Sequence, residues 1–162
     1  MTGSRTSSHR RRTRERGAAV VEFALVLPLF LALVFGVISY GWMLSYRQSI
    51  SQAAAEGARA VAVAPNGTPN LGAVAAAAVN RSLSSYGVTC EGGAMRHDGT
   101  TVGSCTIPAS STTCPAPNPS RARCVTVTLA HRYRANPLIP SFPGLGLTLP
   151  SELRFASTVE VS

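Results

Sequence analysis

The residue with the clearest chemical consequence is Glu22, the one charged side chain in an apolar run from Ala18 to Leu44. A charged carboxylate at the middle of a bilayer costs roughly 2.5–3.5 kcal/mol, and less toward the interface, so such groups usually mark function. We therefore take Glu22 as a functional residue. The alternative is an interfacial carboxylate whose oxygens reach water near the inner face of the membrane.

The other chemically capable side chains form no catalytic pattern. His97 and His131 are isolated, without a carboxylate at ligand or triad spacing, and Asp98 is the only aspartate. No serine lies in a Gly-x-Ser-x-Gly turn, and no glycine-rich run follows a strand and opens a helix. We therefore predict a structural or binding protein rather than an enzyme, with no cofactor, no metal site and both histidines on the surface.

All four cysteines follow the apolar run: Cys90, Cys105, Cys114 and Cys124. An even number on one side of a membrane segment predicts an oxidising compartment and two disulfides. The spacings contain no Cys-x-x-Cys pair, which disfavours a structural zinc site. Three pairings are possible, and the one we favour is Cys114–Cys124, which closes a Pro-rich loop.

An arginine-rich segment precedes the apolar run. Residues 1–17 carry six arginines and one acid, and the whole chain has a formal charge of +8. Positive charge beside a membrane span marks its cytoplasmic end, so we expect residues 1–17 to be a cytoplasmic leader, of which residues 1–16 lack regular structure. Such an arm can also bind nucleic acid. The position of this segment beside an apolar helix already explains its arginine content, and we expect no nucleic-acid partner.

The apolar run has the length of one membrane span. Phe23–Leu44 contains no charge and makes a helix of roughly 33 Å at about 1.5 Å a residue, long enough for a bilayer core of about 30 Å. We assign residues 18–46 to a transmembrane helix. Its outer end carries Tyr40, Trp42 and Tyr46, which we interpret as an aromatic belt at the membrane interface.

Two features of this run leave alternatives open. Pro28 predicts either a simple kink or a local opening that lets subunits pack closely, because membrane helices tolerate proline where neighbours satisfy the freed carbonyl. A secretory signal peptide is the competing interpretation of the whole run. Its apolar core is normally roughly 7–15 residues long, and the nearest Ala-x-Ala site, Ala53–Ala55, lies too far beyond the core. A soluble protein cut near Ala55 is therefore disfavoured.

The helix is expected to continue outside the membrane over residues 47–64, because small and apolar residues recur there at three-to-four spacing. Residues 65–162 then form an extracytoplasmic α+β domain with Pro-rich loops. Asn70 is predicted to cap a second, amphipathic helix that Gly87 closes.

Period-two alternation predicts the strands of this domain. It covers residues 125–130 and 153–161, and residues 101–107 form a plausible third strand. The predicted fold class is α+β: a long N-terminal transmembrane helix extends into a small disulfide-stabilised ectodomain with one further helix and a short antiparallel sheet. A small domain buries little core, so two disulfides would help it stay folded.

Three short motifs between Arg16 and Arg59 occur in a fixed order. They are a glycine followed at the fifth position by Glu-Phe, a Leu-Pro within the apolar run, and a Glu-Gly-Ala-Arg after it: Gly17, Glu22, Phe23, Leu27, Pro28, Glu56, Gly57, Ala58 and Arg59. In combination they resemble the TadE-like family, the minor pseudopilins of tight-adherence (Flp) pilus systems. The resemblance is strong over about a quarter of the chain.

The resemblance implies that a membrane prepilin peptidase cuts between Gly17 and Ala18. Glu22 would then be the fifth mature residue and would pair with the freed amino terminus of a neighbouring subunit, because a buried ammonium and carboxylate together cost far less than either alone. The implied partners are this peptidase, other pilins and pseudopilins, the pilus assembly platform and membrane lipid. The alternative is a permanently anchored single-pass protein that keeps its leader and binds something outside the cell.

Overall fold

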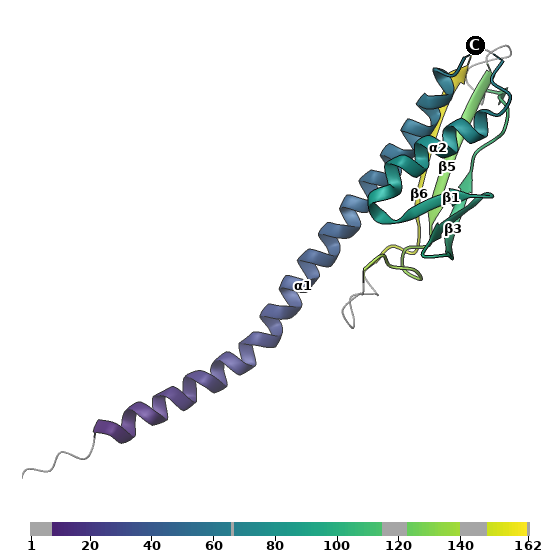
Figure 1. Cartoon of the computed structure of the whole chain (residues 1–162). Helices are drawn as coiled ribbons and strands as arrows, with labels where there is room; N and C mark the ends of the chain where they lie inside the picture. The colour runs from purple at the N-terminus through teal and green to yellow at the C-terminus, as the bar shows by residue number, and fades with distance from the viewer. Residues whose placement is uncertain (1–7, 66, 115–122, 140–148, 162) are drawn as a thin grey trace, which may run out of the picture. The chain divides into compact units, whose positions relative to one another are not determined.

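The computed structural model describes residues 8–65, 67–114, 123–139 and 149–161, with side chains described from Ala18 onward (Figure 1). The chain divides into two compact units, Met1–Tyr40 and Gly41–Ser162. The fold is α+β, with a long N-terminal apolar helix, a second helix, an antiparallel sheet and two disulfides, as the sequence predicts.

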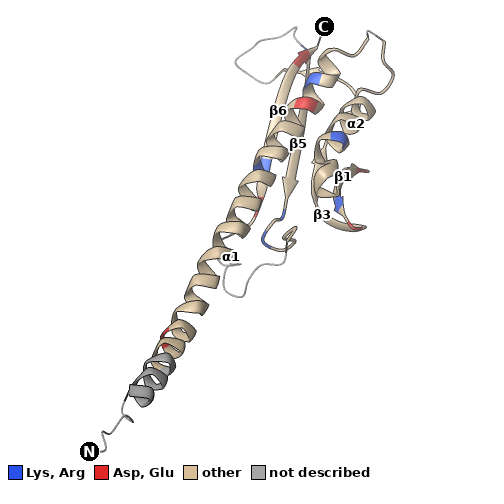
Figure 2. Ribbon diagram, turned by 60° about the vertical axis from the view of Figure 1, so that its left-hand side comes forward, with Lys and Arg blue, Asp and Glu red and all other residues tan. Residues whose placement is uncertain are grey.

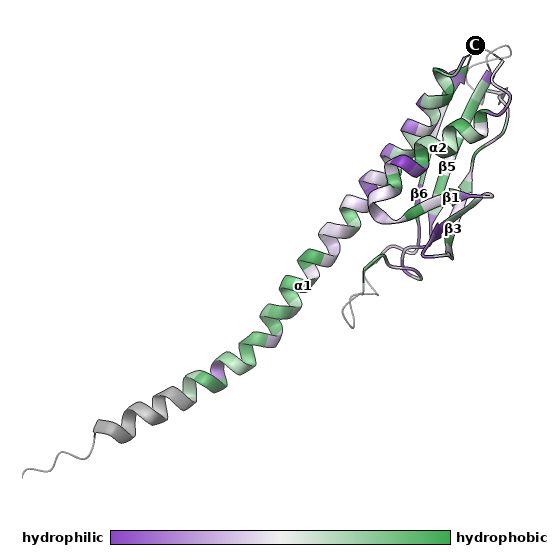
Figure 3. Ribbon diagram, viewed as in Figure 1, coloured by the Kyte–Doolittle hydropathy of each residue, from purple (hydrophilic) through white to green (hydrophobic). Residues whose placement is uncertain are grey.

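The first helix, α1, runs from Ser8 to Ala62 with Pro28 inside it. Its Ala18–Ala62 part is long and apolar enough to cross a membrane. Between Glu22 and Arg47 this part carries no charged residue (Figure 2), and its first half is hydrophobic (Figure 3). The expectation of a leader without regular structure is wrong for residues 8–16, whose backbone is helical. Residues 1–7 lie outside the described part.

The second helix, α2, spans Leu71–Leu83 and begins where the sequence predicts. The side chain of Asn70 accepts a hydrogen bond from the backbone N–H of Ala73 at 3.0 Å, which satisfies one of the unpaired donors of a helix start. A short 3₁₀ turn, η1 (Ser84–Tyr86), follows. Gly87 then ends it with a φ of +63° and donates its N–H to the carbonyl of Ser84, a conformation that suits glycine.

All strand pairs of the sheet are antiparallel. Its strands are β1 (Val88–Glu91), β2 (Ala94–His97), β3 (Thr100–Thr106), β4 (Thr112–Thr113), β5 (Arg123–His131) and β6 (Leu153–Val161). The order is β1-β2-β3-β5-β4, and β6 also pairs with β5 along its whole length. The strands β3, β5 and β6 agree with the predicted ones, whereas β1, β2 and β4 were not predicted.

Two tight turns explain the unpredicted hairpins. Gly92 and Gly93 join β1 to β2 with φ values of +58° and +83°, and Asp98 and Gly99 join β2 to β3 with +48° and +76°. Two successive positive φ values are the requirement of type I′ turns, whose twist matches that of the paired strands. The Gly-Gly and Asp-Gly pairs therefore fix both hairpins locally.

The core of the Gly41–Ser162 unit lies between one face of the sheet and the two helices. Figure 1 shows α1 and α2 covering the same face. The core is formed by apolar residues of both helices and of the inward positions of the strands, chiefly Met43, Tyr46, Ile50, Ala53, Ala54, Ala58, Val61, Ala75, Val79, Leu83, Val88, Met95, Val102, Val125, Val127, Leu129 and Tyr133. The C-terminal third of α1 is therefore an integral part of the folded domain.

Two disulfides tie the domain together. Cys90–Cys105 joins β1 to β3 with a Cα–Cα distance of 5.8 Å, and Cys114–Cys124 joins the segment after β4 to β5 at 4.9 Å. The second pair is the one favoured from the sequence. The side-chain oxygen of Asn80 on α2 accepts a hydrogen bond from the N–H of Cys90 at 2.6 Å, and the Asn80 side-chain NH₂ donates to the carbonyl of Cys90 at 3.4 Å. These two bonds attach α2 to the backbone of β1.

Candidate functional site

The residues singled out from the sequence divide between the two units. Gly17 has a helical backbone in α1, and its surroundings lie outside the described side chains. Glu22, Phe23 and Pro28 are exposed on α1, in the Met1–Tyr40 unit. No described residue forms an ion pair with Glu22.

The Glu-Gly-Ala-Arg motif is a packing element in the second unit. Gly57 is buried, and a Cβ placed on it would lie 2.8 Å from Cγ2 of Val79 on α2. Glycine at this position therefore lets α2 approach α1 closely. Glu56 and Arg59 on either side are exposed and make no ion pair with each other in the described structure.

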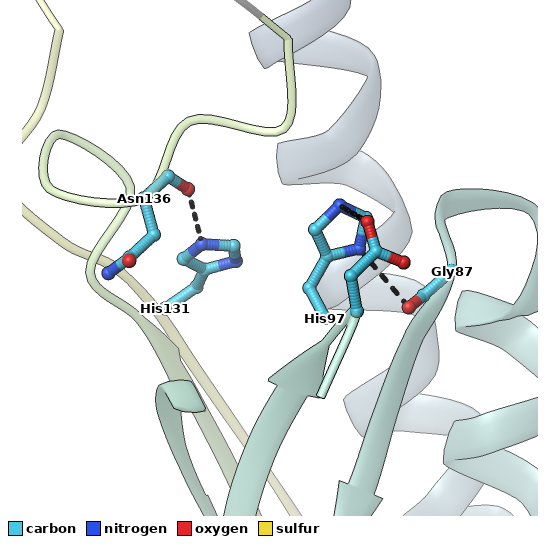
Figure 4. Close-up of polar contacts among 5 residues, drawn as sticks. Gly87, His97, His131 and Asn136 are labelled. Carbon is cyan, nitrogen blue, oxygen red and sulfur yellow. Dashed lines mark hydrogen bonds and ion pairs between the residues drawn. The ribbon is translucent and has the colours of Figure 1, made fainter. Parts of the chain in front are cut away.

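A buried polar cluster, which the sequence interpretation missed, connects α1 to the sheet. Tyr46 on α1 and His131 at the end of β5 are both fully buried, and Tyr46 Oη lies 2.6 Å from His131 Nδ1. The other ring nitrogen, Nε2, lies 3.0 Å from the carbonyl of Asn136 (Figure 4). Since a carbonyl only accepts, Nε2 carries the proton, and neutral Nδ1 accepts from the Tyr46 hydroxyl. We call Tyr46, His131 and Tyr133 the buried tyrosine–histidine cluster.

Aromatic contacts hold the cluster in place. The Tyr46 ring stacks on Tyr133 at 5.8 Å and meets the edge of His131 at 5.2 Å between centroids. It also contacts Tyr86 of η1 at 5.0 Å, and Trp42 meets Tyr86 edge-on at 5.8 Å. One ring of α1 therefore contacts η1, the end of β5 and the segment that follows.

The cluster corrects two sequence-based expectations. Tyr46 does not lie in an aromatic belt at the membrane interface, because its ring is enclosed in the domain core. His131 is not a surface histidine either. Burial lowers the pKa of His131 and is the largest effect; the hydrogen bond to the Asn136 carbonyl raises it, and the electrostatic effects of His97 and Arg132 lower it by smaller amounts. Burial also raises the pKa of Tyr133.

The period-two alternation of side chains along β5 could have predicted part of this cluster from the sequence. Val125, Val127 and Leu129 face the core, and His131 and Tyr133 continue the same odd-numbered series. A strand residue two positions beyond a buried one lies on the same face, so the His131 side chain could have been assigned to the core, whereas Tyr133 lies in the turn after the strand.

His97 has a different setting at the partly exposed end of β2. Its Nδ1 lies 3.2 Å from the carbonyl of Gly87, and its Nε2 lies 3.5 Å from a carboxylate oxygen of Asp98 (Figure 4). Across the described residues, no group of three or more His, Cys, Asp or Glu side chains is arranged to hold a metal ion.

These features define a class of protein: a disulfide-linked α+β domain built onto the end of one long apolar helix that suggests membrane anchoring. Residues 17–59 match the family model described as TadE-like protein. The matched segment contains every motif residue from Gly17 to Arg59 and is consistent with a TadE-like protein. No curated protein and no solved structure shows a significant match to the chain.

Proposed function

We propose that this chain is a minor pseudopilin, a membrane-anchored structural component of tight-adherence pilus assembly that a prepilin peptidase cuts between Gly17 and Ala18. The observation that carries the proposal is Glu22, an exposed carboxylate five residues after Gly17 that forms no ion pair with any described residue and lies at the start of an apolar helix matched by the family model.

Cleavage would create the partner that Glu22 lacks. Removal of residues 1–17 leaves an ammonium group on Ala18, close to the carboxylate in sequence. The amino terminus of one subunit pairs with Glu22 of the next, and this pair sets the register between packed helices because an orphaned charge in the membrane is costly. Other pilins or pseudopilins, which share an apolar helix, are the proposed partners.

The membrane span is proposed to end before Met43. The side chains of Met43 and Tyr46 are buried in the domain, so they are not available to lipid. Ala18–Trp42 still gives roughly 37 Å of helix, enough for a bilayer core of about 30 Å. The N-terminus is placed in the cytoplasm and the C-terminal domain outside, an orientation that the arginine-rich leader and the two disulfides support.

The N-terminal residue of the protein recovered from its native membrane tests this proposal. We expect mass spectrometry to find a chain that begins at Ala18. A chain that retains its leader would overturn the peptidase step and favour a permanently anchored binding protein.

The role of Glu22 needs a separate test. We expect Glu22→Ala to abolish site-specific crosslinking between the helices of neighbouring subunits, whereas Glu56→Ala, which removes an exposed acid from the same helix, leaves crosslinking unchanged. Crosslinking that survives Glu22→Ala would contradict the register role even if the leader is removed.

A further inference from the structure

Five exposed arginines gather at the end of the Gly41–Ser162 unit where α1 enters it: Arg47, Arg96, Arg132, Arg134 and Arg154. We call this group the arginine end. Figure 2 shows basic segments at this end of β5 and near the β3 label. Arg47 lies within the matched segment 17–59 but in none of its three motifs, the other four arginines lie outside that segment, and the proposed function gives none of the five a role.

Contacts between neighbouring strands bring the group together. Arg47 lies over the ring of Phe155 at 5.8 Å, and Phe155 follows Arg154 in the sequence of β6. Arg132 donates to the carbonyl of Thr101 at 3.5 Å, and Thr101 pairs with Arg96 across β2 and β3. The arginines therefore span the width of the sheet from β2 to β6.

No described acid forms an ion pair with an arginine of this end. The described residues contain one ion pair, His97–Asp98. Glu152 lines a shallow surface pocket with Arg132, but it forms no ion pair in that part of the structure. The two acids at this end, Asp98 and Glu152, leave an excess of positive charge.

The sequence places this charge close to the outer end of the apolar helix. Arg47 follows Tyr40, the last residue of the first unit, by seven positions, or about 10 Å of helix. That distance is comparable to the range of about 8–10 Å over which charges interact at ordinary ionic strength. Positive residues normally concentrate on the cytoplasmic side, so a cluster at the outer end calls for an anionic partner.

We propose that the arginine end binds the phosphate groups of lipids on the outer surface of the membrane that α1 spans. A guanidinium group presents parallel donors that match phosphate oxygens, and arginines on several strands can each engage a separate headgroup. The interaction holds the domain against the membrane surface. It requires that α1 be anchored but does not require leader removal or pilus assembly, so it can fail or hold independently of the proposed function.

The test uses the full chain in lipid nanodiscs, made either of phosphatidylcholine alone or with about one third phosphatidylglycerol, an anionic lipid that attracts basic groups. Hydrogen exchange followed by mass spectrometry reports on peptides covering residues 94–102, 129–136 and 152–156. We expect these peptides to exchange more slowly in the anionic discs, by about fivefold for each engaged arginine. Salt at about 0.5 M should remove the difference.

Charge-matched variants locate the effect. The double substitution Arg132→Gln and Arg154→Gln should abolish most of the lipid-dependent slowing, whereas Arg59→Gln with Arg123→Gln, which removes the same charge from the opposite end of the domain, should leave it intact. Comparing the two lipids within each variant cancels any local effect of the substitution on exchange.

Three results would overturn the proposal. One is equal exchange of the wild-type chain in the two lipids. Another is slowing that survives the Arg132 and Arg154 substitutions. The third is equal slowing by inorganic phosphate at about 20 mM in neutral discs, which would identify a site for free phosphate instead of lipid headgroups.

Discussion

At the scale of single residues, His131 makes the stability of the domain depend on pH. Because burial lowers its pKa below the ordinary value of 6.5 in the folded chain, the unfolded chain takes up a proton first as the pH falls. The contribution of His131 is therefore complete above about pH 6.5 and is lost as the pH drops toward the lowered folded pKa.

We expect the denaturant concentration at the unfolding midpoint, measured for the full chain in detergent micelles, to decrease when the pH is lowered from about 8 to about 5.5. His131→Gln keeps a donor and an acceptor without titrating, and it should reduce this pH dependence. His97→Gln, at a partly exposed histidine, provides the comparison. An unchanged pH dependence in His131→Gln would show that another group is responsible.

The hydroxyl of Tyr46 is the second residue whose loss should be measurable. Tyr46→Phe keeps the ring contacts but leaves Nδ1 of His131 buried without a donor, which costs about 1–3 kcal/mol of unfolding free energy. Tyr40→Phe removes an exposed hydroxyl and should change stability little. Chemical denaturation monitored by near-UV circular dichroism compares the two variants, and equal losses would argue against a specific Tyr46–His131 bond.

At the scale of elements, the close approach of α1 and α2 depends on Gly57. A Cβ at this position would press against Val79, a stiff and fully buried side chain. The motif that the sequence associates with the family therefore has a structural reason: a glycine at the crossing of the two helices, between charged residues that face solvent.

We expect Gly57→Val to lower the unfolding free energy by about 1–3 kcal/mol, because the added side chain forces the helices apart. Ala55→Val places the same β-branched side chain on the exposed face of α1 and controls for helix propensity. Urea unfolding of both variants measures the difference. Similar midpoints would mean that the helix crossing adjusts without cost.

The elements also show what could be predicted from the sequence. The Asn70 cap, the helix after it and the alternation of β5 and β6 depend on local patterns, and the structure has all of them. The β1–β2 hairpin was missed because its strands are only four residues long, although the Gly92-Gly93 pair between them is a turn signal.

Tyr46 and the arginine end needed the tertiary structure. An aromatic residue with a hydroxyl suits a membrane interface and a buried hydrogen bond equally well, and only the position of His131 decides between them. The arginines lie far apart in sequence, so their common location follows from strand pairing. Local patterns therefore determined most elements, and long-range pairing determined the buried cluster and the arginine surface.

At the scale of the whole molecule, the two disulfides should differ in importance. Cys90–Cys105 closes a separation of 15 residues between two buried cysteines, for which chain entropy predicts about 3 kcal/mol. Cys114–Cys124 closes 10 residues, and Cys114 is only half-buried.

We expect Cys90→Ala with Cys105→Ala to destabilise the domain by about 3–5 kcal/mol, since packing is lost together with the crosslink. Cys114→Ala with Cys124→Ala should cost less. Guanidinium unfolding of the two double variants under non-reducing conditions gives the comparison. A larger loss for the second pair would contradict this ranking.

The continuity of α1 also has a mechanical consequence. The Gly41–Ala62 part of α1 supplies Met43, Tyr46 and Ile50 to the centre of the domain core, and the chain continues through the same helix into the apolar segment that suggests membrane anchoring. The Gly41–Ala62 part lies alongside β5 and β6 (Figure 1). A pulling force on the anchor would therefore load these contacts in shear, so that many must break at the same time, and the domain would resist extraction under tension better than one hung from a loop.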